Sequence, residues 1–367
     1  MPLQCGIVGL PNVGKSTLFS ALVRRQVPAD IYPFTTIEPN VGVVSVPDDR
    51  LNKLGEILQP EKIIPTTLRI VDIAGLIKGS HHGEGLGNQF LSQIREVDAI
   101  IHLVRCFSSE QVTHITPDLD PICDIDIVDT ELILKDLDTV FSAMEKVSTK
   151  AKSGDAVASK EQENLELISS HLDSGKSARE LILDEQGETL LKEFSLITSK
   201  PVLYVGNENE EEATSHHSRA ATDALISWGN ANNQDVIILS AALEHELTFL
   251  EDEEERQFFM KEWALEQAGL EMLIQSSYRL LNLITFFTTE SNHVQAWTVQ
   301  KGTTAPQAAG QIHSDFESGF IRADVYHYED IIQTCSEPKL REAGKIRSEG
   351  RDYVVQDGDV IQFKFNV

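Results

Sequence analysis

Cysteines and long apolar runs are scarce in this 367-residue chain, and each scarcity argues against a class of protein. The four cysteines are widely spaced and form no CxxC pair, which argues against a disulfide framework and a structural zinc site. No apolar run approaches the length that spans a bilayer, and the first ten residues lack the charged start of a signal peptide. We therefore expect a cytoplasmic protein with no membrane partner.

Basic residues are also few: 31 Lys and Arg stand against 58 Asp and Glu, and the formal net charge is -27. Because a net negative charge of this size repels phosphate groups, non-specific attraction to nucleic acid is disfavoured. An RNA partner would need a local basic patch. Two clusters could supply one, or could be ordinary solvated side chains: Lys339, Arg341, Lys345, Arg347 and Arg351, and Lys146, Lys150 and Lys152.

The order of apolar runs and helical patterns predicts the α/β fold class. Between residues 3 and 107 the two alternate, as in βαβ units with a parallel sheet. From about 129 the chain is more polar, and a break at 153–157 separates two apolar seams, which predicts an inserted antiparallel helical hairpin. The first seam alternates spacings of four and three: Ile133, Leu137, Val140, Met144 and Val147.

The C-terminal residues change character again and predict a small α+β domain. Strand-like stretches occur at 294–299 and 319–328, and a short helix is expected from Pro306 to about Phe316. The stretches DYVVQ and VIQFKFN flank the turn residues DGD, so we expect them to pair as a closing hairpin.

Residues 9–16, GLPNVGKS, fit the pattern GxxxxGK[ST] between an apolar run and a helical pattern. Glycines let successive backbone N–H groups turn inward around phosphates, and the helix N-terminus adds its dipole. Lys15 would reach the β- and γ-phosphate oxygens, and the Ser16 hydroxyl would ligate Mg²⁺. The pattern predicts a Rossmann-like P-loop NTPase fold.

Two later segments indicate which class of P-loop protein this is. Residues 72–75, DIAG, end an apolar run, so Asp72 can hold Mg²⁺ through water while the Gly75 amide meets the γ-phosphate. The loop YPFTTIEPN offers Thr35 and Thr36 as a second Mg²⁺ contact. The order of these motifs points to the GTPase-like class of P-loop proteins.

The residue that activates water is not obvious. Leu76 stands where many such enzymes place a Gln that orients the attacking water, so hydrolysis would need another polar group, a metal ion or a partner. The glycine-rich segment 78–89 is expected to be a switch loop. His114, in the loop QVTHITP, is a candidate for assisting hydrolysis, whereas His102, within AIIHLV, is expected to be a core residue.

The stretch NENE at 207–210 ends an apolar run where guanine-specific proteins of this class carry NKxD. The Asp of that motif accepts from two N–H groups of guanine that adenine lacks. Asn207 can still reach N7 and the 6-amino group of adenine, while Glu210 is one methylene too long for the guanine contact. Glu208 replaces the Lys of that motif. We expect ATP to be favoured; an acidic surface loop is the alternative interpretation.

Together these motifs resemble the Obg-like ATPases, or YchF family, of the translation-factor-related P-loop NTPases. The matching stretches run nearly from end to end: GLPNVGKSTLF, FTTIEPN, VDIAGLIKG, GEGLGNQFL, VRCF, APQAAGQIH and DGDVIQFKFNV. The resemblance implies a P-loop domain over 1–281 with a coiled-coil insertion at 129–197. A TGS domain, which has a β-grasp fold, would follow at 282–367.

The resemblance also implies site residues. Mg²⁺ would be held at Ser16 and at Thr36 rather than Thr35, and Gly75 would sense the γ-phosphate. His114 matches a histidine proposed to assist hydrolysis, and Glu208 departs from the family, in which its position is commonly apolar. Nucleotide contacts would come from Asn12, Val13, Gly14, Lys15, Ser16 and Thr17, and Asn12 matches a P-loop residue linked to K⁺ use.

We therefore expect a monomeric, Mg²⁺-dependent ATPase with slow intrinsic turnover, which binds ATP and ADP and acts as a switch on the ribosome. Two alternatives stay open. One is a nucleotide-gated binding adaptor in which hydrolysis is incidental, and the other is a GTPase that prefers GTP.

Overall fold

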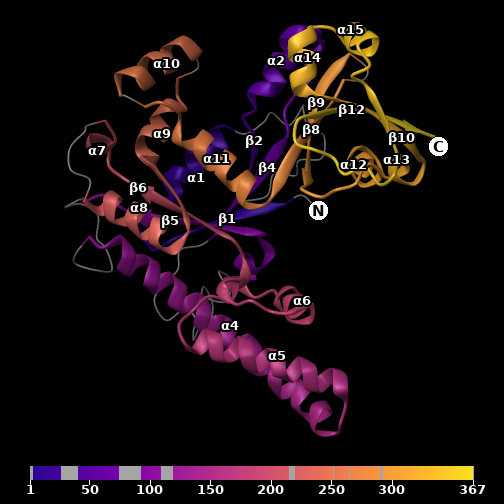
Figure 1. Cartoon of the computed structure of the whole chain (residues 1–367). Helices are drawn as coiled ribbons and strands as arrows, with labels where there is room; N and C mark the ends of the chain where they lie inside the picture. The colour runs from indigo at the N-terminus through magenta and orange to yellow at the C-terminus, as the bar shows by residue number, and fades with distance from the viewer. Residues whose placement is uncertain are drawn as a thin grey trace. The chain divides into compact units, whose positions relative to one another are not determined.

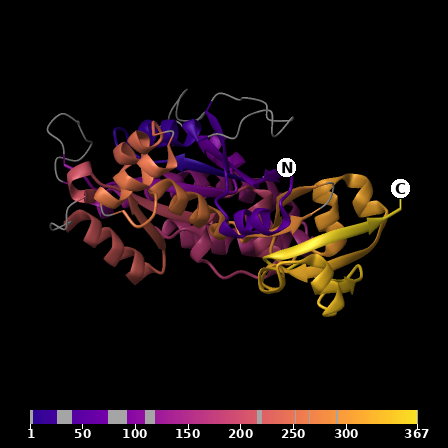
Figure 2. The ribbon, with the colours of Figure 1, turned by 90° about the horizontal axis from the view of Figure 1, so that it is seen from above.

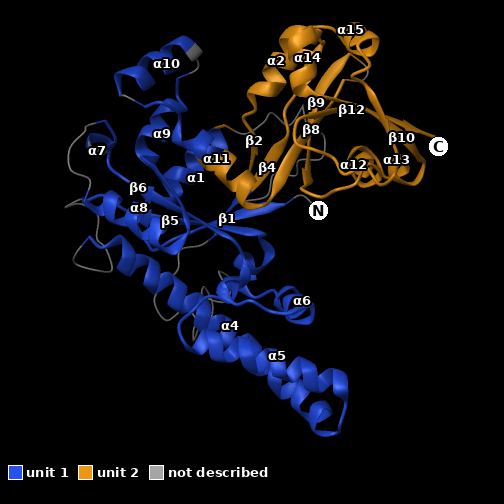
Figure 3. Ribbon diagram, in the orientation of Figure 1, with its two compact units in different colours: residues 1–24, 38–42, 70–272 blue, residues 25–37, 43–69, 273–367 orange. Residues whose placement is uncertain are grey.

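The computed structural model describes residues 3–25, 40–73, 92–108, 119–214, 220–250, 252–263, 265–289 and 292–366. The chain divides into two compact units, coloured blue and orange in Figure 3. The first comprises residues 1–24, 38–42 and 70–272, and the second comprises residues 25–37, 43–69 and 273–367. Both units are therefore discontinuous in the sequence.

A six-stranded sheet, most of which belongs to the first unit, has the strand order β2-β4-β1-β5-β6-β7 (Figure 1). Its strands are β1 Gln4–Val8, β2 Val41–Ser45, β4 Thr67–Asp72, β5 Ala99–Arg105, β6 Val202–Asn207 and β7 Asp235–Leu239. β5 pairs in parallel with β1 and β6, and β6 pairs in parallel with β7. β5 is buried along its whole length, His102 and Arg105 included, as a central strand of a parallel sheet is. The predicted α/β sheet is confirmed.

The strand order changes direction at β1, whose neighbours are β4 and β5. In open α/β sheets, ligands bind at the carboxyl ends of the strands at such a switch point. The described α-helices that accompany this sheet outside the hairpin are α1 Lys15–Arg24, α6 Glu185–Glu193, α7 Glu210–Thr214, α8 Ala220–Asn232, α9 Ala241–Leu247, α10 Glu253–Glu262 and α11 Gly269–Leu280, the last of which continues into the second unit. α1 begins directly after the P-loop and buries Leu18, Ala21 and Leu22, which share one helical face.

The predicted helical hairpin is present. α4 (Pro121–Lys152) and α5 (Ala156–Asp173) run antiparallel side by side (Figure 1), and Asp155 caps α5 by accepting from the backbone N–H groups of Val157 and Ala158. α4 starts earlier than residue 129, where the insertion was expected. The shared core contains the seam residues Ile133, Leu137, Val140 and Val147 with Leu165, Ile168 and Leu172, while Met144 packs against it. Among the described helices, none is long and apolar enough to cross a membrane.

A buried carboxylate fastens the hairpin to the segment that returns to β6. Asp136 of α4 is fully buried, and its oxygens accept from the backbone N–H groups of Ile197 and Thr198 at 2.9 and 2.7 Å. The Thr198 hydroxyl donates to the same carboxylate at 2.6 Å. Burial raises the pKa of Asp136, and these bonds offset part of that effect. η3 (Ile197–Ser199) is thereby held against α4.

A second six-stranded sheet, with the order β11-β10-β12-β8-β9-β3, forms the second unit. Its strands are β3 Lys62–Ile64, β8 Leu283–Thr288, β9 His293–Gln300, β10 Phe320–His327, β11 Arg347–Glu349 and β12 Asp359–Phe365. Figure 2 shows β12 in yellow, leading to the C-terminus. Helices α2 Asp49–Leu58, α12 Ala305–Ile312, α13 Ser314–Ser318, α14 Tyr328–Thr334 and α15 Glu337–Glu342 complete the unit. α12 and α13 correspond to the expected helix near 306–316.

The expected closing hairpin is wrong. β12 pairs with β10 and β8, while the backbone of the DYVVQ stretch bonds to the first residue of α12 and to a residue just before it. Tyr353 O accepts from Ala305 N at 2.8 Å, and Val355 N donates to Thr303 O at 3.0 Å. One of the turn residues also bonds to another strand, because the Asp357 carboxylate accepts from Thr285 N of β8 at 2.9 Å. A turn sequence alone could not reveal these distant partners.

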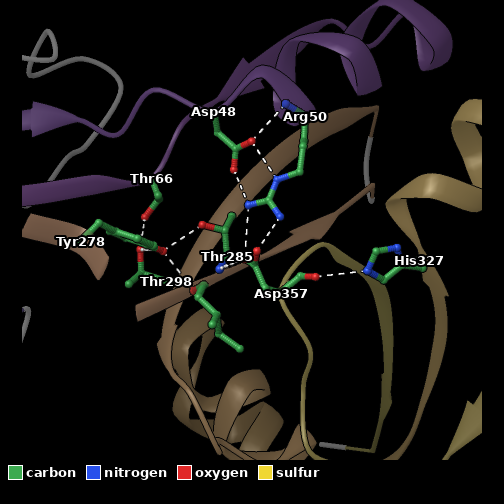
Figure 4. Close-up of polar contacts among 9 residues, drawn as sticks. Asp48, Arg50, Thr66, Tyr278, Thr285, Thr298, His327 and Asp357 are labelled. Carbon is green, nitrogen blue, oxygen red and sulfur yellow. Dashed lines mark hydrogen bonds and ion pairs between the residues drawn. The ribbon is translucent and has the colours of Figure 1, made fainter. Parts of the chain in front are cut away.

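α2 and β3 come from the N-terminal half of the chain but complete the second unit. β3 pairs in parallel with β9, and Leu51 and Leu54 of α2 share a core with Phe287, Tyr326 and Val360 among others. Figure 4 shows a polar cluster in the same unit, where Arg50 lies between Asp48 and Asp357. The second unit is therefore built from two separate stretches of sequence.

Candidate functional site

The P-loop follows β1 in a backbone shape that two of its residues make possible. Asn12 has φ 64° and Gly14 has φ 97°, and both values lie in the left-handed region. A Cβ on Gly9 would come within 2.6 Å of Leu103 O on β5, and one on Gly14 would overlap the Asn207 side chain. Glycine is required at both positions because the loop packs directly on its neighbours.

The phosphate side of the site joins the P-loop to the end of β4. Lys15 Nζ lies 3.0 Å from Asp72 Oδ1 and also donates to Ile73 O, and both side chains are part-buried. Ser16 is exposed in the first turn of α1, and Thr17 lines the adjacent cavity. Lys15, Ser16 and Asp72, predicted from two separate motifs, thus belong to one edge of the sheet.

Asn207 at the end of β6 links two parts of the site. Its side-chain Nδ2 donates to Val13 O in the P-loop, and its Oδ1 accepts from Ala241 N at the start of α9, both at 2.9 Å. The side chain is 5% exposed. One amide N–H and one oxygen lone pair remain beyond these two bonds, so the predicted contact to a base is compatible with this crosslink.

The two glutamates that follow Asn207 differ in environment. Glu208 is buried, its backbone N–H donates to Leu239 O at 3.0 Å, and Thr222 Oγ1 of α8 lies 3.5 Å from its Oε2. Glu210 is exposed and begins α7. The roles predicted for both residues at the base stay predictions.

A cavity of about 470 Å³ adjoins the P-loop. Its walls come from the ends of β5, β6 and β7 and from the first turns of α1, α7 and α9: Gly14, Thr17, Phe107, Ser108, residues 207–211, Ala241 and Ala242. Phe107, Ser108, Ala241 and Ala242 were missed by sequence reasoning. A signal for them was available, since each pair lies just past the end of a strand of the parallel sheet, β5 or β7, where ligands bind.

Several predicted residues lie outside the described part of the chain: Thr35, Thr36, Gly75, Leu76 and His114. Their roles stay predictions. His102 is described, and it is buried, as expected of a core residue. Burial, with the nearby positive charge of Arg179, lowers the pKa of His102 to about 3, so its imidazole is neutral at physiological pH.

The phosphate side also suits a divalent cation. P-loop NTPases in general use Mg²⁺, which prefers oxygen ligands and is held by a P-loop hydroxyl and a carboxylate. Ser16 and Asp72 supply those two oxygens, and Asp72 already has a positive charge at 3.0 Å in Lys15. The donor set therefore fits Mg²⁺.

A P-loop after β1, a carboxylate at the end of β4 and an Asn at the end of β6, all at one edge of a parallel sheet, define a P-loop NTPase domain. A family model described as a 50S ribosome-binding GTPase matches residues 4–134. A second, YchF-GTPase_C, described as a protein of unknown function, matches residues 283–366.

Curated relatives match over the whole length. The Bacillus subtilis and Escherichia coli O157:H7 proteins, both named ribosome-binding ATPase YchF, are 48% and 47% identical over 367 residues, with each chain fully covered. The solved Schizosaccharomyces pombe YchF GTPase matches with a TM-score of 0.88 and 35% identity, covering 99% of this chain and 97% of that one. A GTP-binding protein from Pyrococcus horikoshii, at 20% identity and a TM-score of 0.63, shares the fold. The chain belongs to the YchF family.

Proposed function

We propose that the protein is an Mg²⁺-dependent NTPase that binds and hydrolyses ATP in preference to GTP and acts as a nucleotide switch on the ribosome. The observation that carries the proposal is the cavity beside the P-loop. Glu208, Glu210 and Glu211 line it, and no Lys or Arg occurs among its described lining residues. The names of the relatives, which include both ATPase and GTPase, leave the choice of base to the site itself.

The phosphate end would work through charge and position. Lys15 and the inward N–H groups of the P-loop would bind the β- and γ-phosphates, with the N-terminus of α1 adding its dipole. Ser16, Thr36 and Asp72 would hold Mg²⁺, which when bound neutralises charge on the phosphates. Asn12 would contact K⁺, Gly75 would sense the γ-phosphate, and His114 would assist hydrolysis. These roles are supported by family membership and by the contact between Lys15 and Asp72.

The end of the cavity that would hold the base would select adenine through the positions of the protein's hydrogen-bond acceptors. A guanine site needs a carboxylate at the correct reach for the ring N–H and the 2-amino group. Glu210 is longer than the Asp that meets them in guanine-specific proteins, and it begins a helix at the rim of the cavity. Asn207, held between the P-loop and α9, would meet the N7 edge of the ring.

Calorimetric titration of metal-stripped protein with ATP and with GTP, repeated after addition of Mg²⁺ and K⁺, tests the proposal. We expect tighter binding of ATP and a clear gain with Mg²⁺. A preference for GTP would overturn the argument about the base and support the GTPase alternative.

The adaptor alternative predicts the same binding but no chemistry. Single-turnover assays of the wild type and His114→Ala, with and without ribosomes, separate the two. Slow hydrolysis that ribosomes accelerate, and that His114→Ala reduces, is expected for the switch. Binding without hydrolysis under all conditions would favour the adaptor.

The ribosome is the proposed partner because the curated relatives are named ribosome-binding ATPases. A cytoplasmic location would follow from that partner, and a monomeric state stays a prediction. The basic cluster of the proposed TGS domain, residues 282–367, would touch RNA, with the tip of the hairpin in the proposed 129–197 insertion as a second contact. Lys345 and Arg347 are about half exposed, but each also meets a carboxylate: Asp330 at 3.2 Å and Glu349 at 3.7 Å. Their reversal to Glu should weaken ribosome co-sedimentation; an unchanged pellet would refute this contact.

A further inference from the structure

The short helix α10 (Figure 1) has no buried face among its described side chains. Its apolar residues Phe258, Phe259 and Met260 are exposed or half-buried, and Phe258 keeps 59% of its surface exposed. A helix of 10 residues is marginal by itself, and most surface helices gain stability by burying an apolar stripe against another element. α10 therefore presents apolar surface that the described part of the chain leaves open.

The aromatic rings of α10 form a row with one open end. The Phe258 and Phe259 rings meet edge to face with centroids 5.7 Å apart, and the Phe259 ring lies 5.5 Å from that of Trp263, which directly follows the helix. Phe259 and Trp263 are half-buried, so Phe258 is the exposed end of this row. A single exposed apolar side chain is common, but a supported aromatic ring is the kind of residue that anchors protein interfaces.

Acidic side chains surround Phe258 on its own side of the helix. Residues three and four positions apart are neighbours on a helix surface, and for Phe258 these are Glu254, Glu255, Lys261 and Glu262. All four are exposed, and three of them are carboxylates. We call these five residues the Phe258 face, which combines an apolar centre with a negatively charged rim.

The second basic residue of α10 is directed away from this face. Arg256 is two positions from Phe258 and so lies on another side of the helix. Its Nη2 is 3.8 Å from Glu271 Oε1 on α11, and both side chains are about one quarter exposed. The positive charge of Arg256 therefore faces α11 and does not balance the carboxylates around Phe258.

An exposed ring close to α10 in the sequence shows which chemistry suits this region. Phe249, between α9 and α10, is 53% exposed, and the guanidinium of Arg24 lies 3.8 Å from its ring centroid. This is a cation–π contact. Because Arg both stacks on rings and pairs with carboxylates, an arginine-rich segment can match an aromatic centre and an acidic rim together.

We propose that the Phe258 face is a docking surface for a basic, arginine-rich segment of a partner protein that carries an apolar anchor residue. The anchor would pack on the aromatic row, and the arginines would meet Glu254, Glu255 and Glu262. RNA and anionic lipid surfaces suit this face less well, because the same carboxylates repel phosphate groups. A symmetric contact with a second copy would bring two acidic faces together. No bound nucleotide is needed for this interaction.

Fluorescence anisotropy with labelled synthetic peptides tests this surface on the full-length protein. The first probe is an amphipathic peptide with leucines on one helical face and arginines beside them. The second has the same composition in scrambled order, and the third is an RNA oligonucleotide of similar length. The wild type should bind the amphipathic peptide more tightly than the scrambled one, and salt should weaken that binding. Any binding of RNA should not depend on Phe258.

Variants of the Phe258 face separate the two parts of the contact. Phe258→Ala should raise the Kd for the amphipathic peptide about tenfold or more, because aromatic anchors dominate such interfaces. The double variant Glu254→Gln, Glu255→Gln should raise it about threefold and reduce its salt dependence, as expected of exposed rim charges.

Matched controls come from the other helices of the same unit. Phe141→Ala removes a ring of α4 that is 50% exposed, and Glu185→Gln with Glu188→Gln removes two exposed carboxylates of α6. Both should leave the Kd for the amphipathic peptide unchanged. Because Phe258 is exposed, Phe258→Ala should also keep the melting temperature and the ATP hydrolysis of the wild type.

Four outcomes would overturn the proposal. The first is a wild type that does not bind the amphipathic peptide or binds both peptides equally, and the second is a Phe258→Ala variant that binds as tightly as the wild type. Loss of RNA binding in Phe258→Ala would assign the face to nucleic acid instead. Self-association seen by light scattering in the wild type and lost in Phe258→Ala would assign it to a second copy of the chain.

Discussion

Two ion-paired clusters, one in each unit, use similar side chains for different purposes. In the first unit the ammonium of Lys15 meets one oxygen of Asp72 at the edge of the cavity. In the second unit the guanidinium of Arg50 makes four bonds of 2.7–3.2 Å with Asp48 and Asp357 (Figure 4). A Lys is a movable point charge with three donors, whereas an Arg fork fixes its partners in a plane.

The comparison sets a proposed binding contact against a structural one. Burial alone would lower the pKa of Arg50, but its bonds and its attraction to Asp48 and Asp357 raise that pKa. Asp48 also caps α2, and Asp357 also accepts from Thr285 N, so each carboxylate makes a second structural hydrogen bond. Among the described residues, Lys15 Nζ bonds only one oxygen of Asp72 and the backbone oxygen of Ile73, and we expect a phosphate to replace these contacts. Substitutions in the two clusters should therefore have opposite effects on binding and stability.

Lys15→Met should have the largest effect, and it should fall on function. Removing the phosphate-binding charge should reduce ATP hydrolysis by about 100-fold or more. The melting temperature should change little, since a single pair at the edge of a cavity contributes about 1 kcal/mol or less. Lys53→Met, on the exposed side of α2, is the matched control for both assays. A collapse of stability in Lys15→Met would mean that the pair with Asp72 is structural.

Arg50→Met should show the reverse pattern. It leaves two carboxylates facing each other and should cost about 2 kcal/mol in urea unfolding, less than for a fully buried pair because Asp357 is half exposed. The Kd for ATP should stay within about twofold of the wild type. Arg50→Lys keeps the positive charge but loses the planar guanidinium, so its free energy of unfolding should lie between those of the wild type and Arg50→Met. Equal stability of all three proteins would show that the cluster is incidental.

Tyr278→Phe should have the smallest effect at neutral pH. Its hydroxyl donates to Ile284 O at 3.0 Å, and its loss should cost about 1 kcal/mol. Burial raises the pKa of Tyr278 to about 12, above the value of about 10 in an unfolded chain. The stabilisation is therefore complete below pH 10 and is lost as the pH rises through 12. The free energy of unfolding, measured from pH 8 to 12, should fall more steeply in the wild type than in Tyr278→Phe. The control variant Tyr328→Phe should behave like the wild type.

Contiguous patterns were enough to predict much of the fold, including the P-loop that borders the cavity. The P-loop motif encodes its own conformation, because Gly14 and the helix that starts at Lys15 are local features. The hairpin followed from the spacing of its seam, since apolar residues at intervals of three and four have only each other to pack against.

What the sequence could not supply depends on partners far along the chain. β3 is three residues long and is defined by pairing with β9, so its sequence carries no strand pattern of its own. Asn207 was predicted to face a base, but its crosslink from Val13 to Ala241 needs three strand ends in register. The burial of Glu208 likewise depends on α8, which no local rule places beside it.

The split origin of the second unit also sets an order of events during synthesis. α2 and β3 emerge more than 200 residues before β9 and the rest of their core. At translation rates of about 5–20 residues per second, Leu51 and Leu54 stay without those partners for about ten seconds or longer. A chain that stops at residue 281 never buries them in that core. Truncation at that point should therefore yield an aggregation-prone fragment rather than a clean NTPase domain.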